Sequence, residues 1–176
     1  MRNFRFKELL VRWYQMAVFS AVLRMHGDRG PYNIPPLDER NWGGGYLHTG
    51  QPNELWSYGE EVYQILRKYY DIRISMHDYI KSLFTEASEN GSPLIRPLFY
   101  EFPEEKACWD IQDEYMFGSR YLIAPILSLH TYERQIFLPS GRWKQLGTEA
   151  VFEGNTFITV PAPLDTIPVF ERLQKD

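Results

Sequence analysis

Arg24 and His26 are the first residues of this sequence whose types and spacing could do chemistry. They end a short run, residues 21–26, in which alternate residues share one face of a β-strand, and a polar Gly-Asp-Arg-Gly loop follows. In a parallel barrel, the carboxyl ends of the strands and the loops after them form the active-site face, so the pair predicts site residues. The alternative is two ordinary polar residues at a strand end, because such a short motif is weak evidence.

The element that must position this pair is a helix over the preceding residues. One apolar stripe recurs along it at helical spacing: Leu9, Trp13, Met16 and Ala17. A helix that leads directly into a short strand and a loop is an α/β pattern.

A long region without periodicity, residues 31–56, follows the loop. It contains four prolines and the Gly43–Gly45 run, which predict no regular element. Loops of this length tend to be functional or disordered, and Trp42 and Tyr46 favour packing. The glycine run is not a phosphate-binding loop, because no Lys-Ser/Thr pair follows it.

A capping box, Ser57 to Glu60, predicts the start of one long helix that ends at Asn90-Gly91. Its apolar residues keep the helical period throughout: Val62, Ile65, Leu66, Tyr69, Ile72, Met76, Ile80, Leu83, Phe84 and Ala87. His77 and Asp78 are neighbours on this helix and so do not face each other, which argues against an acid–base pair.

Residues 94–102 form an apolar run between two prolines, which is typical of a strand buried on both faces. Helix, strand, loop, helix and strand over residues 1–102 match the last strands and helices of a (β/α)8 barrel. After a helical turn around residues 113–117, residues 103–176 predict an antiparallel β unit. Its expected strands are 121–127, 134–138, 143–146, 156–160 and 167–170.

Composition limits the partners and the compartment. The 176 residues are 44% hydrophobic and 24% charged, with a net charge of −4 and no basic run, so nucleic acid is not an expected partner. The one cysteine, Cys108, is expected to be a buried inert thiol, and no cysteine cluster suggests a metal site. No apolar run reaches the length of a membrane helix, and the first residues do not resemble a signal peptide, so a cytoplasmic location is the default expectation. Asn90-Gly91-Ser92 fits a glycosylation site, but we favour a helix end.

Two long blocks of this sequence resemble glycoside hydrolase family 31, the α-glucosidases and α-xylosidases. Residues 8–29 follow the family's Glu-Leu-x-x-Arg-Trp-x-Gln-x-x-x-Phe-x-x-x-x-Arg-x-His run, and residues 92–127 follow its Arg-Pro-Leu-Phe-x-x-Phe-Pro and Tyr-Met-Phe-Gly segments. The matching positions of the first block are Glu8, Leu9, Arg12, Trp13, Gln15, Phe19, Arg24 and His26. Asp78 replaces a family proline, so less of a helix kink is expected there.

The resemblance implies the end of the catalytic barrel followed by the proximal β-sandwich domain of an O-glycosyl hydrolase. It implies a retaining enzyme that hydrolyses terminal α-linked glucosyl or xylosyl residues of oligosaccharides without a cofactor. His26 is then a hydrogen-bond partner of the bound sugar, Arg24 supports it, and Trp42 lies near the mouth of the site. The family's two catalytic aspartates belong to earlier motifs that do not occur here, and we assign no catalytic role to Asp28, Asp38, Asp110 or Asp113.

The chain is therefore expected to be inactive alone, with the missing N-terminal part of the same enzyme as its partner. Two other hypotheses stay open. A carbohydrate-binding module would need an exposed aromatic platform, for which Trp143, Phe152 and Phe157 are the candidates. A structural or interaction protein would use the open barrel edge. The apolar residues expected on the exposed helix face are Leu9, Trp13, Val62, Ile65 and Tyr69.

Overall fold

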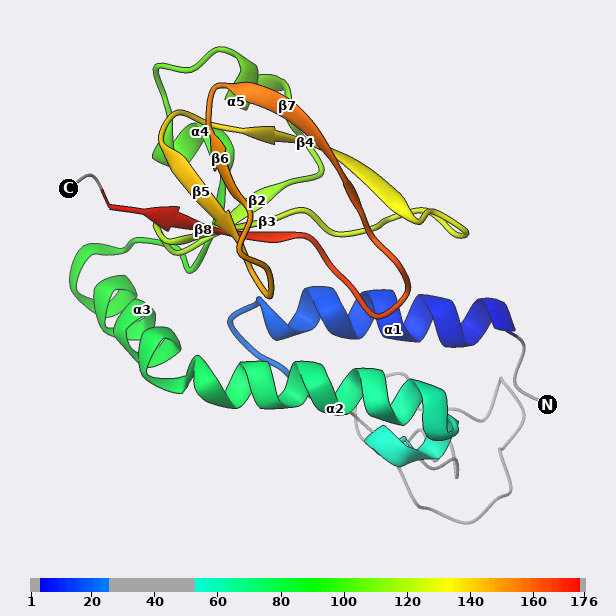
Figure 1. The fold of residues 1–176 in the computed structure, drawn as a ribbon. Helices are drawn as coiled ribbons and strands as arrows, with labels where there is room; N and C mark the ends of the chain where they lie inside the picture. The colour runs from blue at the N-terminus through cyan, green and yellow to red at the C-terminus, as the bar shows by residue number, and fades with distance from the viewer. Residues whose placement is uncertain (1–3, 26–52, 175–176) are drawn as a thin grey trace, which may run out of the picture.

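The computed structural model describes residues 4–25 and 53–174 (Figure 1). Helix α1 (Phe4–Val18) lies between helix α2 (Glu60–Ser75) and the strands. A short 3-10 turn, η2 (Leu55–Tyr58), precedes α2, and α3 (His77–Asn90) follows it. No helix in these two ranges is long and apolar enough to cross a membrane.

Helix α2 packs through the apolar face that its periodicity predicts, whereas α1 does not: Leu9, Trp13 and Met16 of its predicted stripe are exposed. Val11 and Val18 of α1 are fully buried, and they share a core with Val62 and Leu66 of α2. The same core includes Phe117 of the sheet, so it joins the helical layer to the strands. Val62, Ile65 and Tyr69 are therefore buried, and the expectation that they lie on an exposed face is wrong.

The single long helix expected up to Asn90 is divided at Met76. The Met76 amide bonds the carbonyls of both Ile72 and Arg73, and the helical path turns there (Figure 1). No proline is needed for this turn, because Met76, which is buried, and Tyr79, which is partly buried, both pack on the core that reaches the sheet. The predicted end is confirmed, since Gly91 adopts the left-handed conformation that closes α3. Ser57 pairs with Glu54 in a capping box of η2, not with Glu60.

Within the described residues, eight strands form two antiparallel sheets, and their pairing changes the expected layout. One sheet has the order β1-β2-β3-β8-β5-β6, and the other pairs β4 with β7. The bounds are β1 (Ile95–Pro97), β2 (Tyr115–Phe117), β3 (Tyr121–Ile123), β4 (Glu133–Leu138), β5 (Arg142–Gln145), β6 (Val151–Glu153), β7 (Thr156–Pro161) and β8 (Val169–Leu173). All five expected later strands are thus found close to their predicted positions, as β3, β4, β5, β7 and β8, while β2 and β6 were not predicted as strands.

The strand expected over residues 94–102 is confined to β1, because residues 98–101 form the short helix α4 (Leu98–Glu101). β1 pairs with β2, where a helical turn was expected, and not with residues 21–25. The last two strands of a parallel barrel would lie side by side, and these two segments do not pair. Arg96 of β1 is buried and ion-paired with Glu86 of α3 and Glu101 of α4, which fixes this junction.

A second core lies within the β unit. Trp143, Phe170 and Leu138 are fully buried there, together with Cys108 of the short helix α5 (Ala107–Asp110). Burial raises the pKa of Cys108 to about 12, so the expectation of a buried inert thiol is confirmed.

Candidate functional site

Of the two predicted site residues, Arg24 is among the described residues and His26 is not. Arg24 lies just after α1, and its side chain is exposed. His26 and Trp42 lie outside the described residues. Residues 22–25 are not in a strand, contrary to expectation, because no neighbouring strand in the described chain hydrogen-bonds them.

The end of α1, which leads into Arg24, is held by two side chains from other elements. The Arg73 guanidinium donates to the carbonyls of Val18 (2.7 Å) and Ala21 (2.9 Å). The Tyr115 hydroxyl donates to the carbonyl of Phe19 over 3.1 Å. Carbonyl groups at a helix end have no partner inside the helix, so these bonds fix the direction in which the chain leaves α1.

Arg12 fastens α1 to the β unit. Its guanidinium is buried and donates to four backbone carbonyls: Ala162 (2.8 Å), Thr166 (2.8 Å), Thr131 (3.1 Å) and Pro163 (3.1 Å). These acceptors belong to the loops before β4 and after β7. The planar fork of five donors makes arginine suited to bind several carbonyls at once.

Glu8 and Gln15 lie about one helical turn before and after Arg12, and they also attach α1 to the β unit. Glu8 is 1% exposed and accepts a 2.8 Å hydrogen bond from the His130 amide. Gln15 is also buried and donates to the carbonyl of Leu164 over 2.8 Å. With Arg12 they form the α1 latch, which we define as Glu8, Arg12 and Gln15. The most recognisable polar residues of the first sequence block are thus structural.

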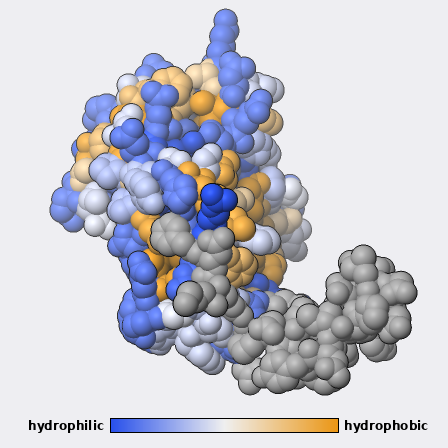
Figure 2. All heavy atoms as spheres, turned by 90° about the vertical axis from the view of Figure 1, so that its right-hand side faces the viewer, coloured by the Kyte–Doolittle hydropathy of each residue, from blue (hydrophilic) through white to orange (hydrophobic). Residues whose placement is uncertain are grey.

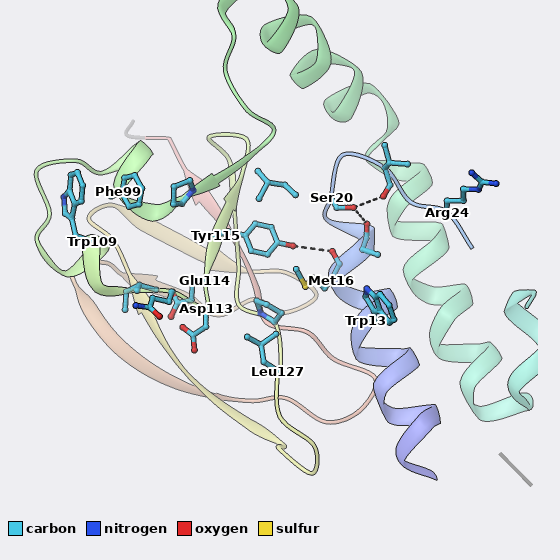
Figure 3. A pocket seen from close by; sticks show the side chains of 17 residues that line it. Trp13, Met16, Ser20, Arg24, Phe99, Trp109, Asp113, Glu114, Tyr115 and Leu127 are labelled. Carbon is cyan, nitrogen blue, oxygen red and sulfur yellow. Dashed lines mark hydrogen bonds between the residues drawn. The ribbon is translucent and has the colours of Figure 1, made fainter. Parts of the chain in front are cut away.

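A groove of about 790 Å³ separates the α1 side of the molecule from the β unit (Figure 3). Trp13, Met16, Val22 and Arg24 line one wall. The opposite side is lined by Ile95, Pro97, Phe99, Trp109, Ile111, Gln112, Asp113, Glu114, Tyr115, Pro125 and Leu127. Arg24 therefore reaches a concave surface that also carries aromatic and polar side chains.

The two acidic residues of the groove have different environments. Asp113 is ion-paired with Arg134 over 2.7 Å, and the hydrogen bond from Arg134 lowers the pKa of Asp113. Glu114 is 6% exposed, accepts a hydrogen bond from the Phe137 amide, and leaves its Oε2 atom without a partner. Burial raises the pKa of Glu114 to about 7. Within residues 5–25 and 53–174, no group of three His, Cys, Asp or Glu side chains is arranged to hold a metal ion.

Of the three aromatic residues considered for a sugar platform, only Phe157 is exposed. Trp143 is 0% exposed and donates its indole N–H to the Pro139 carbonyl, so it cannot meet a ligand. Phe152 is partly buried and Phe157 is exposed. Sequence reasoning missed Trp109, which is 59% exposed in the groove; its position beside an expected buried cysteine disguised it.

Comparison with known proteins identifies the family to which the chain belongs. The sequence model described as the glycosyl hydrolases family 31 TIM-barrel domain matches residues 2–83, and the one described as the glycosyl hydrolase family 31 C-terminal domain matches residues 91–174. The two matches follow one another along nearly the whole chain. The chain belongs to glycosyl hydrolase family 31, and it comprises the end of the TIM barrel and the C-terminal β domain.

Relatives named for their glycosidase activity support this assignment. Alpha-glucosidase 2 of Bacillus thermoamyloliquefaciens is 32% identical over 93% of this chain, and neutral alpha-glucosidase C of Homo sapiens is 34% identical over 94%. A family 31 alpha-xylosidase from a soil metagenome, solved with xylose, is 39% identical with a TM-score of 0.85 over 97% of this chain. The chain spans only 18%, 16% and 25% of these three proteins, respectively.

Proposed function

We propose that this chain is the C-terminal part of a retaining α-glycosidase that removes terminal α-linked glucosyl or xylosyl residues from oligosaccharides. The observation that carries the proposal is the ordered match of both family 31 domains along the chain. We also propose that the domain boundary lies between residues 83 and 91, ahead of the earlier expectation at residue 102. The pairing of β1 with β2 supports this position.

The two reacting carboxylates of this enzyme lie outside these 176 residues. Retaining glycosidases use two carboxyl groups about 5 Å apart, one as nucleophile and one as acid and base. The family's Trp-x-Asp-Met-Asn-Glu nucleophile motif does not occur in this sequence. The barrel match covers residues 2–83, whereas a complete (β/α)8 barrel takes roughly 250 residues.

The residues of this chain then bind and position the sugar. His26 forms a hydrogen bond with a hydroxyl group of the bound glycosyl residue and Arg24 supports His26, which is a binding role without proton transfer. Arg73 and Tyr115 hold the turn that leads to both, and the α1 latch ties that turn to the β domain. The β domain therefore serves as the rigid support of one wall of the site.

The partner that completes the barrel packs on the exposed side of α1. Leu9 and Trp13 of α1 are 53% and 68% exposed. Val22, which belongs to the unpaired segment 22–25, is 71% exposed. In a parallel barrel, the strand that precedes a helix lies beside the strand that follows it and is covered by that helix. Figure 2 shows the side of the molecule that lies on the right in Figure 1, and apolar patches lie between polar regions on this surface.

A hybrid enzyme tests this proposal. The matching quarter of the soil-metagenome alpha-xylosidase is replaced with residues 1–176 of this chain, so that the recipient supplies both aspartates. We expect the hybrid to hydrolyse an aryl α-xyloside or α-glucoside. A hybrid that folds, shown by its circular dichroism and cooperative melting, but turns over neither substrate would overturn the proposal.

A further inference from the structure

Strand β7 has one open edge and runs along the outside of the β unit (Figure 1). It belongs to a two-stranded sheet in which β4 is its only neighbour among the described residues. The Ala162 amide donates to the Tyr132 carbonyl over 2.7 Å, and hydrogen-bonded pairs alternate with non-bonded pairs along an antiparallel ladder. In the register of the two strands, this alternation directs the amide and carbonyl groups of Phe157 and Thr159 away from β4.

The opposite edge of the β4–β7 pair is already occupied. The same alternation directs the Phe137 amide of β4 outward, and there Glu114 accepts its hydrogen bond over 2.9 Å. On the β7 edge, the described residues supply only a long contact, 3.5 Å from the Thr156 hydroxyl to the Phe157 carbonyl. The backbone groups of β7 are therefore the ones that remain open to a further strand.

The β7 edge lacks the features that usually prevent exposed strands from pairing. Natural proteins protect such edges with charged residues, prolines, bulges or very short strands. β7 has six residues, whereas the outer strands of the other sheet, β1 and β6, have three each. It carries no charged side chain, and its one proline, Pro161, lies at its end. Because identical edges bring identical charges together, an uncharged edge suits pairing with a second copy of this chain.

We propose that two copies of this chain associate through β7 in antiparallel orientation, with the two-fold axis at Ile158. Phe157 of each copy then lies opposite Thr159 of the other, and each such pair exchanges both of its N–H···O hydrogen bonds. The β4–β7 pairs of the two copies join into one continuous sheet. The interface uses the same patch on both copies, as two-fold homodimers do.

The side chains of β7 suit this register. Phe157 is 55% exposed, and its ring lies 5.0 Å from the ring of Phe137, which holds it against the sheet. In the dimer it lies beside Thr159 of the second copy on the same face, and aromatic and β-branched side chains stabilise each other across antiparallel strands. None of residues 156–161 lines the groove of Figure 3, so this surface differs from the one assigned to the missing barrel. The inference goes beyond the proposed hydrolysis and does not depend on it.

The test is sedimentation equilibrium of the 176-residue chain carrying Leu9→Lys and Trp13→Lys, which removes association through α1. We expect a monomer–dimer equilibrium with a Kd on the order of 0.1 mM, because one pair of strands buries less area than a stable dimer needs. Thr159→Pro in the same background removes an outward amide but no bond to β4, and should weaken dimerisation about tenfold or more. A chain that stays monomeric up to about 1 mM would overturn the proposal.

Gln135→Pro is the matched control. Gln135 of β4 lies directly opposite Thr159, so its amide points to the other edge of the same pair of strands. This substitution should leave the Kd within about twofold of the background, and both proline variants should melt cooperatively. Equal weakening by the two substitutions would overturn the assignment to β7.

A cross-link tests the register without the proline variants. Ile158→Cys, in the same background, places two thiols at the axis in a non-hydrogen-bonded pair, where Cα atoms lie about 4.5 Å apart, a distance that a disulfide spans. Oxidised glutathione should therefore link this variant into a covalent dimer. Thr156→Cys is the control, because the same axis separates its two copies by roughly 13 Å, and native Cys108 is buried. Cross-linking of Thr156→Cys as fast as that of Ile158→Cys would overturn the proposed pairing.

Discussion

At the scale of single residues, the sequence indicated which polar positions of α1 matter, but not what their side chains do. Glu8, Arg12 and Gln15 stood out through the family resemblance, and they prove to be the latch between α1 and the β domain. Their partners are mostly backbone groups more than a hundred residues away, such as the Ala162 carbonyl. A backbone carbonyl has no sequence signature, so no pattern could have predicted these contacts.

Replacing Arg12 should destabilise the chain strongly. Arg12→Ala leaves four carbonyls without their donor in a buried interface, and we expect the free energy of unfolding to fall by about 3 kcal/mol. Urea unfolding measures this loss. Arg67→Ala is the control, because Arg67 makes an exposed pair with Asp71 on α2, and it should change stability by less than about 0.5 kcal/mol. Equal effects of the two substitutions would contradict the latch.

Glu114 should make stability depend on pH in an unusual direction. Below pH 4.5 its carboxyl is protonated in both states, but between pH 4.5 and 7 the folded state keeps a proton that the unfolded chain releases. Stability therefore falls as pH rises through this window, by at most about 3 kcal/mol. Desolvation causes the raised pKa, Asp113 adds to it, and Arg134 opposes it.

Glu114→Gln removes this dependence. The variant should be more stable than the unmodified chain at pH 8 and no more stable at pH 4, as measured by urea unfolding at both values. Glu104→Gln is the control, since Glu104 is exposed and its substitution changes the net charge equally. A stability difference that does not change with pH would show that Glu114 titrates normally.

His26 belongs to the proposed sugar site, and its test uses the hybrid enzyme. His26→Ala should lower kcat/KM on the order of 10²-fold, because a hydrogen bond to the sugar that tightens in the transition state is lost. Steady-state kinetics with the aryl α-glycoside measure this. A change below about twofold, within ordinary scatter, would make His26 an ordinary polar residue.

At the scale of elements, local patterns predicted more than pairings did. β3, β4, β5, β7 and β8 were found from alternation and turn residues, which act over a few positions. The β1–β2 pairing was missed because it joins residues 95–97 to residues 115–117 across α4 and α5, and an apolar run does not specify its partner. Residues 22–25 were read as a strand from alternation alone, although a strand also requires a neighbour.

The exposed stripe of α1 should make the chain associate. Leu9 and Trp13 are exposed one helical turn apart, and only barrel strands absent from this chain would cover them. The double substitution Leu9→Lys and Trp13→Lys should reduce association in sedimentation velocity. Ile74→Lys on α2 is the control, because Ile74 is 56% exposed and lies away from the groove. A similar reduction by both changes would place the associating surface elsewhere.

At the scale of the whole molecule, this chain supplies supporting and binding groups, and we propose that the reacting carboxylates lie outside these 176 residues. The β domain, the latch and the end of the barrel are held together by the cores and contacts described above, so this part of the fold can be understood from the chain itself. The site cannot, because a barrel active site collects residues from the ends of many strands. The sequence could therefore predict the family and the fold class but only a share of the site.

The claim that the reacting carboxylates lie outside these 176 residues is tested most directly by a turnover assay of the 176-residue chain alone. Purified chain, free of host glycosidase, is incubated with aryl α-glucoside and aryl α-xyloside, and the hybrid enzyme serves as the positive control. We predict no release of the aryl group above the blank, because positioning groups without a nucleophile and an acid leave the barrier of the glycosidic bond uncatalysed. Steady turnover that is lost when an aspartate of this chain is replaced would contradict it, since the reacting pair would then lie within these residues.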